Sequence, residues 1–301
     1  MSKDFIQRLI KDKKIQPPEF LYDNINYLTI MGSAAYGVSD DNSDMDVYGI
    51  VTPPVGYVFP HTTGEIQGFG RQIQRFEQWQ QHHIKDPSKN REYDFGIYNI
   101  VKYFQLLMEN NPNIIDSIYT PDRCVLYIDN VGTHLRNNRD IFLHKGAIYK
   151  FRGYAYSQMS KIKNKSNSSN PKRQESIEKY SYDVKFGYHL VRLLLEAEMI
   201  ANSHTLDIEV NRETLKSIRK GEWSFEQLTS WFDNKMISLE TVFENSTLQN
   251  TPDENKIKGI LIECLEMTYG SIDNLLKIST TDSASNKKLI SELKGLISKY
   301  E

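Results

Sequence analysis

Cysteine is nearly absent from this chain, which has only two among its 301 residues, at positions 124 and 264. Two thiols so far apart match no zinc-site spacing, and cysteine poverty is typical of a reducing compartment. The first residues, Met1-Ser2-Lys3-Asp4-Phe5, lack the apolar segment of a signal peptide. A run of about 18 apolar residues, which a membrane helix needs, is also missing. We therefore expect a cytoplasmic protein with no membrane partner.

The chain also lacks an excess of charge of either sign, because 37 Lys and Arg are balanced by 39 Asp and Glu and the net charge is −2. This balance excludes binding of nucleic acid through an overall basic surface, so any such contact would need a local patch. No Gly-x-Ser-x-Gly, catalytic Cys–His or P-loop pattern occurs. The sequence therefore lacks the residues that a hydrolase or P-loop function would need. A hydrophobic content of 39% and a length of 301 residues are typical of one or two folded domains.

A short apolar run near the start of the chain ends at a glycine and a serine. Residues 27–31 are apolar or β-branched, which predicts a buried strand. Gly32 permits a tight turn after this strand, and the Ser33 hydroxyl is suited to cap a following helix. We expect the backbone N–H groups after Gly32 and the Ser33 hydroxyl to bind phosphate oxygens at that helix N-terminus.

Two carboxylates follow after a gap of ten residues, 34–43. Asp44 and Asp46 open a second apolar run, 47–51, and on a strand both point to the same side. Because neighbouring carboxylates repel, such a pair is typical of a cation site, and Mg²⁺ bridging phosphates would suit it. One alternative is a solvated Asp-x-Asp in a polar loop. An EF-hand loop starting at Asp40 is excluded, because it needs Gly and Glu where the sequence has Met and Val.

Gly-Ser, ten residues and then Asp-hydrophobic-Asp-hydrophobic resembles the nucleotidyltransferase signature of the DNA polymerase β superfamily. Three longer strings are similar to a narrower group, the RNA-ligase-associated polymerase-like proteins of bacteria and phages. They are Glu92-Tyr93-Asp94, Glu109-Asn110-Asn111-Pro112-Asn113 and Gly153-Tyr154-Ala155-Tyr156-Ser157-Gln158. The resemblance covers most of residues 25–220. It implies an α+β fold, in which a small mixed-sheet, palm-like nucleotidyltransferase domain precedes an all-α domain.

The resemblance also implies a third carboxylate and a reaction. Residues 93–97 predict a strand, and the superfamily carries its third acidic residue on a strand beside the first pair, which here would be Asp94. Asp44, Asp46 and Asp94 would then hold two Mg²⁺ ions, or Mn²⁺ in their place. A nucleotidyl group would pass from a nucleoside triphosphate such as ATP to a hydroxyl, with release of pyrophosphate. The name of the group suggests an RNA end as acceptor, and a structural Asp94 is the alternative.

Two other functions remain open from the sequence. The same chemistry could nucleotidylate a protein or a small molecule, as some relatives do. The chain could also be a nucleotide- or RNA-binding protein without turnover, although an intact trio of aspartates argues against this. The sequence gives neither the base preference, nor the acceptor, nor the oligomeric state.

The composition changes from mixed to helical near residue 145. We therefore expect a catalytic domain over residues 1–145 and a helical substrate- or nucleotide-binding domain over residues 146–301. Residues 74–83 are expected to be a loop or a weak helix. Apolar periodicity predicts helices over residues 5–14, 99–109, 131–142, 146–163, 175–201, 212–219, 225–243, 257–276 and 287–300.

Three basic positions share one face of the helix predicted over residues 175–201. Lys185, His189 and Arg192 are spaced four and three apart, which places them on the same side. Cationic groups in a row favour a facing anion, so we expect them to bind the triphosphate across a cleft from Ser33. The alternative is a solvated face paired with acidic neighbours, Asp183 and Glu196.

A polar loop, 164–175, joins two of the predicted helices. Its simplest role is a surface connector between antiparallel helices. Basic residues in and before it would alternatively form a local patch that meets phosphates, and these are Lys161, Lys163, Lys165, Lys172 and Arg173. Whether this patch binds nucleic acid stays open.

Overall fold

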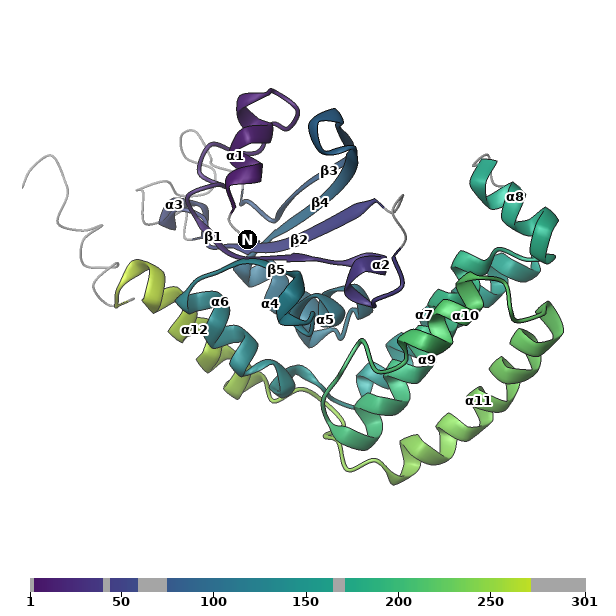
Figure 1. Cartoon of the computed structure of the whole chain (residues 1–301). Coiled ribbons are helices and arrows are strands. Elements are labelled where there is room, and N and C mark those ends of the chain that lie inside the picture. Colours follow the sequence, from purple (N-terminus) through teal and green to yellow (C-terminus); the bar gives the residue numbers. More distant parts are fainter. Residues whose placement is uncertain (1–2, 40–43, 59–74, 165–170, 272–301) are drawn as a thin grey trace, which may run out of the picture.

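A mixed five-stranded sheet and a layer of long helices make up the part of the chain that the structure describes, residues 3–39, 44–58, 75–164 and 171–271 (Figure 1). The structure is a computed structural model. The strand order is β3-β4-β2-β1-β5, and only β2 and β4 are parallel neighbours. The strands are β1 (Ile25–Ile30), β2 (Met45–Val51), β3 (Gln78–Asp86), β4 (Arg91–Asn99) and β5 (Val125–Ile128).

Helices surround the sheet and then continue as a separate layer (Figure 1). Those that accompany the sheet are α1 (Asp4–Lys11), α2 (Gly32–Ala35), α3 (Val55–Val58), α4 (Ile100–Met108), α5 (Pro112–Ile118) and α6 (Asn130–Asn137). The helical layer contains α7 (Gly146–Lys163), α8 (Pro171–Tyr180), α9 (Val184–Ser203), α10 (Arg212–Arg219) and α11 (Phe225–Asn245). The last described helix is α12 (Glu254–Tyr269). The predicted fold class, a small mixed sheet followed by helices, is confirmed.

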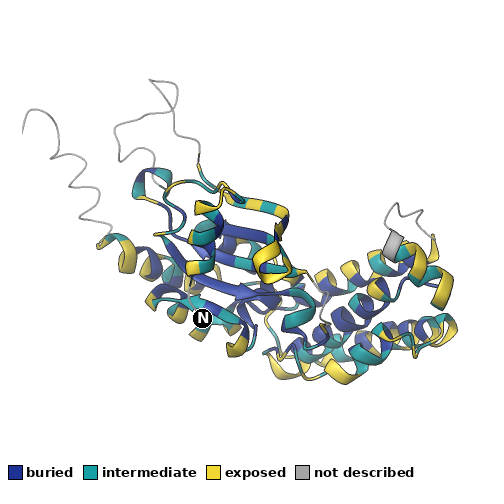
Figure 2. Cartoon of the chain, turned by 45° about the horizontal axis from the view of Figure 1, so that its top comes forward, coloured by how far each residue is buried: buried dark blue, intermediate teal, exposed yellow. Residues whose placement is uncertain are grey.

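The buried strands lie at the centre of the sheet domain (Figure 2). Every residue of β1 is buried, because β1 lies between β2 and β5 and is covered on both faces. The apolar core continues from the sheet into α7 and α9, where Phe151 and Leu190 are fully buried. Among the described helices, none has both the length and the apolarity to cross a membrane.

The prediction of a loop or weak helix over residues 74–83 is wrong, because most of this stretch belongs to β3. Strand β3 pairs only with β4 and lies at the edge of the sheet, so most of its side chains are exposed. An exposed edge strand needs no apolar alternation, and Gln-Trp-Gln-Gln-His-His therefore gives no strand signal in the sequence. The hydrogen-bonded ladder with β4 makes residues 78–86 a strand.

Capping residues in the sequence predicted one of two helix starts correctly. Asn111 caps α5 as predicted, since its side chain accepts a hydrogen bond from the Asn113 N–H at 3.1 Å and Pro112 begins the helix. The helix expected after Ser33 is only the four-residue α2, and Met31 rather than Ser33 is its N-cap. Ser33 lies inside this short turn of helix and is half-buried.

The single helix predicted over residues 175–201 is two helices, α8 and α9. The backbone of Ser181 adopts a left-handed conformation, with φ of 69°, which ends α8. Asp183 then caps α9 by accepting a hydrogen bond from the Lys185 N–H at 2.9 Å. The apolar periodicity continues across this break, which is why the sequence pattern did not reveal it.

The last described helix returns to the sheet domain. One face of α12 is buried against α4 and α6, and His134 on α6 lies 2.7 Å from Glu263. The Tyr269 hydroxyl donates a hydrogen bond to the Pro53 carbonyl, which ties the end of α12 to the sheet domain. Helix α12 thus packs against α4 and α6, helices that accompany the sheet, and the domain boundary expected near residue 145 stays a prediction. The helix predicted over residues 287–300 lies outside the described residues.

Candidate functional site

Asp46 and Asp94 are direct neighbours across the one parallel strand pair of the sheet. Residues 45–51 of β2 pair in register with residues 93–99 of β4, and Asp46 is the partner of Asp94. Paired residues on adjacent strands project their side chains to the same face of a sheet. Burial, followed by the charge of Asp94 and less by that of Asp44, raises the pKa of Asp46 to about 6. The fold therefore keeps two repelling carboxylates side by side.

Gly32 leaves the space that the Asp46 carboxylate occupies. Its φ is +65°, a conformation that favours glycine, and a Cβ at this position would collide with Asp46 Oδ2. The Met31 N–H donates to the Asp46 carbonyl at 2.7 Å, so the turn is joined to β2 beside the carboxylate. The Gly-Ser turn and Asp46, which belong to one sequence motif, are thus in direct contact.

Gly32→Ala is expected to displace Asp46 and reduce the thermal stability, because the methyl group meets both backbone strain and a carboxylate. The cost should be about 1–3 kcal/mol. Circular-dichroism melting would measure it, with Gly259→Ala on α12 as the control, since a Cβ at Gly259 meets nothing within 4 Å. A Gly32→Ala protein that melts with the wild type would contradict this account of the turn.

Asp94 is held by the backbone of the neighbouring edge strand. The His83 N–H donates to Asp94 Oδ1 at 2.6 Å, and His82 Nδ1 lies 3.7 Å from the same oxygen. The β3–β4 register shifts between Gln81 and Ile84, and His83 there adopts a positive φ of 58°. The sequence does not predict this contact, because an irregularity in an exposed edge strand leaves no sequence signal.

Asp44 is exposed and lies immediately before β2. Its charge contributes to the raised pKa of Asp46, so the two carboxylates act on each other. Within the described ranges, however, no group of three or more His, Cys, Asp or Glu side chains is already gathered as a metal site. The structure brings Asp46 and Asp94 together, and a ligand set of three carboxylates stays a prediction.

Helix α9 faces these carboxylates from the helical layer. The ammonium group of Lys185 is exposed, and its charge partly offsets the rise in the pKa of Asp46. Burial raises the pKa of the Tyr188 hydroxyl to about 12, and the Asp46 charge adds to this effect. Lys185 and Tyr188, three residues apart on α9, therefore lie within electrostatic reach of Asp46.

His189 of α9 lies near cationic side chains from α8, α9 and α10. Burial lowers the pKa of this imidazole well below its usual value, and nearby cations, Arg192, Lys185, Arg219 and Arg173, lower it further. The imidazole is therefore neutral at pH 7, and a bound anion would reverse part of this shift. Arg219 Nη1 also donates to the Val38 carbonyl at 2.7 Å, which joins α10 to the segment after α2.

Arg192 has carboxylates as its partners, in place of the phosphates expected for it. Its side chain is only 4% exposed and forms ion pairs with Asp116 of α5 and, at 2.9 Å, with Glu196. The guanidinium lies 4.5 Å above the Tyr36 ring, and the Tyr36 hydroxyl donates to Asp116 at 2.7 Å. A buried charge must be paired, and this cluster pairs Arg192 while joining the two layers. Asp116 is a structural partner in this cluster, although it lies 76 positions from Arg192 in the sequence.

The chain matches the RlaP family, described as the RNA repair pathway DNA polymerase beta family, over residues 3–236. It is also similar to a nucleotidyltransferase-like protein from Exiguobacterium sibiricum 255-15, with 9% identity over 99% of this chain and 90% of that chain. Its TM-score of 0.29 is too low to support the assignment further. No curated protein matches the chain. Since the family match spans most of the sequence, this chain belongs to the RNA repair pathway DNA polymerase beta family.

Proposed function

We propose that this chain is a Mg²⁺-dependent nucleotidyltransferase that moves a nucleoside monophosphate from a nucleoside triphosphate to a hydroxyl, an RNA end being the acceptor. The observation that carries the proposal is the in-register pair of Asp46 and Asp94 on parallel strands, with Gly32 against the Asp46 carboxylate. Membership of a polymerase β family and the charge of Lys185 on α9, which acts on Asp46, support it.

The donor groups match a hard divalent cation. Asp44, Asp46 and Asp94 offer only carboxylate oxygens, which Mg²⁺ and Mn²⁺ prefer. The pKa of about 6 for Asp46 reflects burial and repulsion, and a divalent cation would relieve both. Two bound ions would stabilise charge on the α-phosphate and pyrophosphate and lower the pKa of the attacking hydroxyl.

The residues of the chain would then divide the remaining tasks. The acceptor oxygen attacks the α-phosphorus, the bond to the pyrophosphate oxygen breaks, and the hydroxyl proton leaves toward Asp94. The His83 N–H donates a hydrogen bond to Asp94 Oδ1, so Asp94 Oδ2 is the oxygen that would accept that proton. Ser33 and the N–H groups after Gly32 would bind the β- and γ-phosphates, and Lys185 and His189 would approach them from α9.

The proposal is tested by mixing the purified protein with each α-labelled nucleoside triphosphate and Mg²⁺. A single-stranded RNA with a free 3′-hydroxyl, and the same RNA with that hydroxyl blocked, would serve as acceptors. Label transferred to the first RNA alone, with release of pyrophosphate, is the expected result. Label on the protein itself would favour nucleotidylation of a protein, and absence of transfer and of pyrophosphate release would contradict a transferase.

Lys185→Gln is expected to weaken triphosphate binding about tenfold, because it removes a charge-assisted contact to phosphate. Isothermal titration with a non-hydrolysable triphosphate and Mg²⁺ would measure the affinity. Lys256→Gln, which removes an exposed charge from α12, is the matched control. Equal affinities for the two variants would remove Lys185 from the site and return it to a solvated face.

A further inference from the structure

Helix α7 has an exposed face that the proposed catalytic site does not use. Five residues of α7 lie on one side of the helix by their spacing, and all are exposed. The ring of Tyr154 is 40% exposed. We call this side the α7 face, and its residues are Lys150, Gly153, Tyr154, Ser157 and Lys161. Most of it falls in the string Gly153 to Gln158, which carries part of the family resemblance.

The neighbouring side of α7 is occupied by α11. Tyr149 makes an edge contact with Phe243, with ring centroids 4.9 Å apart, and Tyr156 makes the same kind of contact with Phe232 at 5.4 Å. These two tyrosines are exposed yet have aromatic partners. Among the described residues, Tyr154 contacts no other aromatic ring, so its exposure has no such explanation.

Gly153 adds a second observation on the same face. A Cβ at Gly153 would meet nothing within 4 Å, so the fold does not require glycine there. A helix is less stable with glycine than with alanine at an interior position. Gly153 therefore lowers the stability of α7, although no close packing requires glycine there. The missing side chain leaves bare backbone beside the Tyr154 ring, which lets another chain approach closely.

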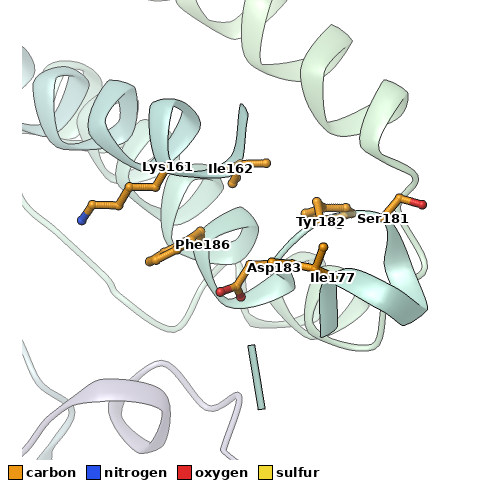
Figure 3. Close-up of a pocket in the computed structure, with 7 residues that line it drawn as sticks. All are labelled: Lys161, Ile162, Ile177, Ser181, Tyr182, Asp183 and Phe186. Carbon is orange, nitrogen blue, oxygen red and sulfur yellow. The ribbon is translucent and has the colours of Figure 1, made fainter. Parts of the chain in front are cut away.

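The C-terminal end of the α7 face lies beside α9, the helix that carries Lys185. Lys161 Nζ lies 5.5 Å from the centroid of the Phe186 ring, and the Arg173 guanidinium lies 4.7 Å from the same centroid. Figure 3 shows Lys161 and Phe186 together at the junction of α7 and α9. Phe186 follows Lys185, whose charge acts on Asp46. The cavity at this junction is only about 10 Å³, enough for one water, so any ligand must lie on the surface.

We propose that the α7 face binds a single-stranded RNA and guides its end toward Asp46 and Asp94. One base would stack on Tyr154, the backbone would pass close to Gly153, and phosphates would meet Lys150 and Lys161. An aromatic platform flanked by lysines suits unpaired bases, because the bases of a duplex are already stacked. The chain has a net charge of −2, so such binding depends on this local patch. The inference rests on the proposed function, since it supplies the acceptor of that reaction.

The test measures RNA binding by the full chain, without nucleotide and in the presence of EDTA. Binding is monitored by fluorescence anisotropy. The probe is a fluorescein-labelled single-stranded oligouridine of about ten nucleotides. Tyr154→Ala is expected to weaken binding about tenfold through lost stacking. Tyr156→Ala is the control, because that tyrosine is also exposed but lies against α11. Lys161→Gln should flatten the salt dependence of the affinity.

Gly153→Leu separates RNA binding from folding. Leucine favours the helix, and a Cβ at this position would meet nothing within 4 Å, so the variant should melt at or above the wild-type temperature. Its side chain should nevertheless block the platform and weaken RNA binding about tenfold or more. A Gly153→Leu or Tyr154→Ala protein that binds the probe like the wild type would overturn the proposal, and so would equal affinity for duplex RNA.

Two separate measurements keep the two proposals independent: RNA binding without nucleotide tests the α7 face, and nucleotidyl transfer with Mg²⁺ tests the catalytic site. If RNA binding depends on Tyr154 but no nucleotidyl transfer occurs, the RNA face stands and the transferase proposal fails. If transfer occurs with unchanged RNA binding in Tyr154→Ala, the RNA face fails and the transferase proposal stands.

Discussion

Asp46→Asn is expected to reduce Mg²⁺-dependent nucleotidyl transfer by about a thousandfold or more, while making the apo protein more stable. The loss of turnover follows because one ligand charge disappears where negative charge must be neutralised. The gain in stability follows because burial and Asp94 hold the pKa of Asp46 at about 6, well above its usual 3.8. At pH 7 the ionised Asp46 therefore destabilises the folded state, by about 1–3 kcal/mol.

The sign of the pH dependence provides an independent check of this account. Since the folded-state pKa of Asp46 is raised, the folded state binds more protons than the unfolded state between pH 3.8 and about 6. The contribution of Asp46 to stability therefore falls as the pH rises through this window and is constant above it. In Asp46→Asn this contribution is absent, so its stability advantage over the wild type should grow from about pH 4 to pH 6 and then level off.

Melting temperatures with and without Mg²⁺ would complete the measurement. Mg²⁺ should raise the melting temperature of the wild type more than that of Asp46→Asn, because the variant lacks one charged ligand. Asp122→Asn is a suitable control, since the Asp122 side chain is 98% exposed and far along the chain from the site. Unchanged turnover in Asp46→Asn would remove Asp46 from the mechanism, and early melting would mark it as a structural residue.

Arg192→Ala is expected to destabilise the protein by about 3–5 kcal/mol, because it leaves Asp116 and Glu196 buried without their cation. Burial raises the pKa of both carboxyl groups, and Arg192 is the charge that opposes this rise. For a chain of this size, the loss corresponds to a melting temperature lower by about 5–8 °C. Differential scanning calorimetry would measure it at pH 7.

The matched control is Arg152→Ala, which removes an exposed ion pair with Glu240 and should cost less than about 1 kcal/mol. Adding Asp116→Asn and Glu196→Gln to Arg192→Met should recover part of the lost stability, because no unpaired charge then remains buried. If Arg192→Ala melted with the wild type but bound triphosphate weakly, Arg192 would instead be the phosphate ligand that its position on α9 first suggested.

Local sequence patterns determined several elements of this protein. An apolar run before Gly32 predicted β1, the Asp44-Met45-Asp46 string predicted a strand start, and Asn111 with Pro112 predicted the start of α5. These features depend on residues close together in the chain, namely on turn geometry, capping and apolar periodicity. The family was also visible in the sequence, because its motif is a short run with fixed spacing.

The tertiary structure alone decided which distant residues meet. The family resemblance placed Asp94 on a strand beside Asp46, but no local pattern set their exact register. No local pattern made an exposed polar stretch into β3 or paired Arg192 with Asp116 either. Each outcome depends on a partner far away in the chain: a strand ladder for β3, and a buried counter-charge for Arg192. Sequence patterns report the local preference of a segment, whereas hydrogen bonds and charges that must be satisfied on burial are paired only when the layers come together.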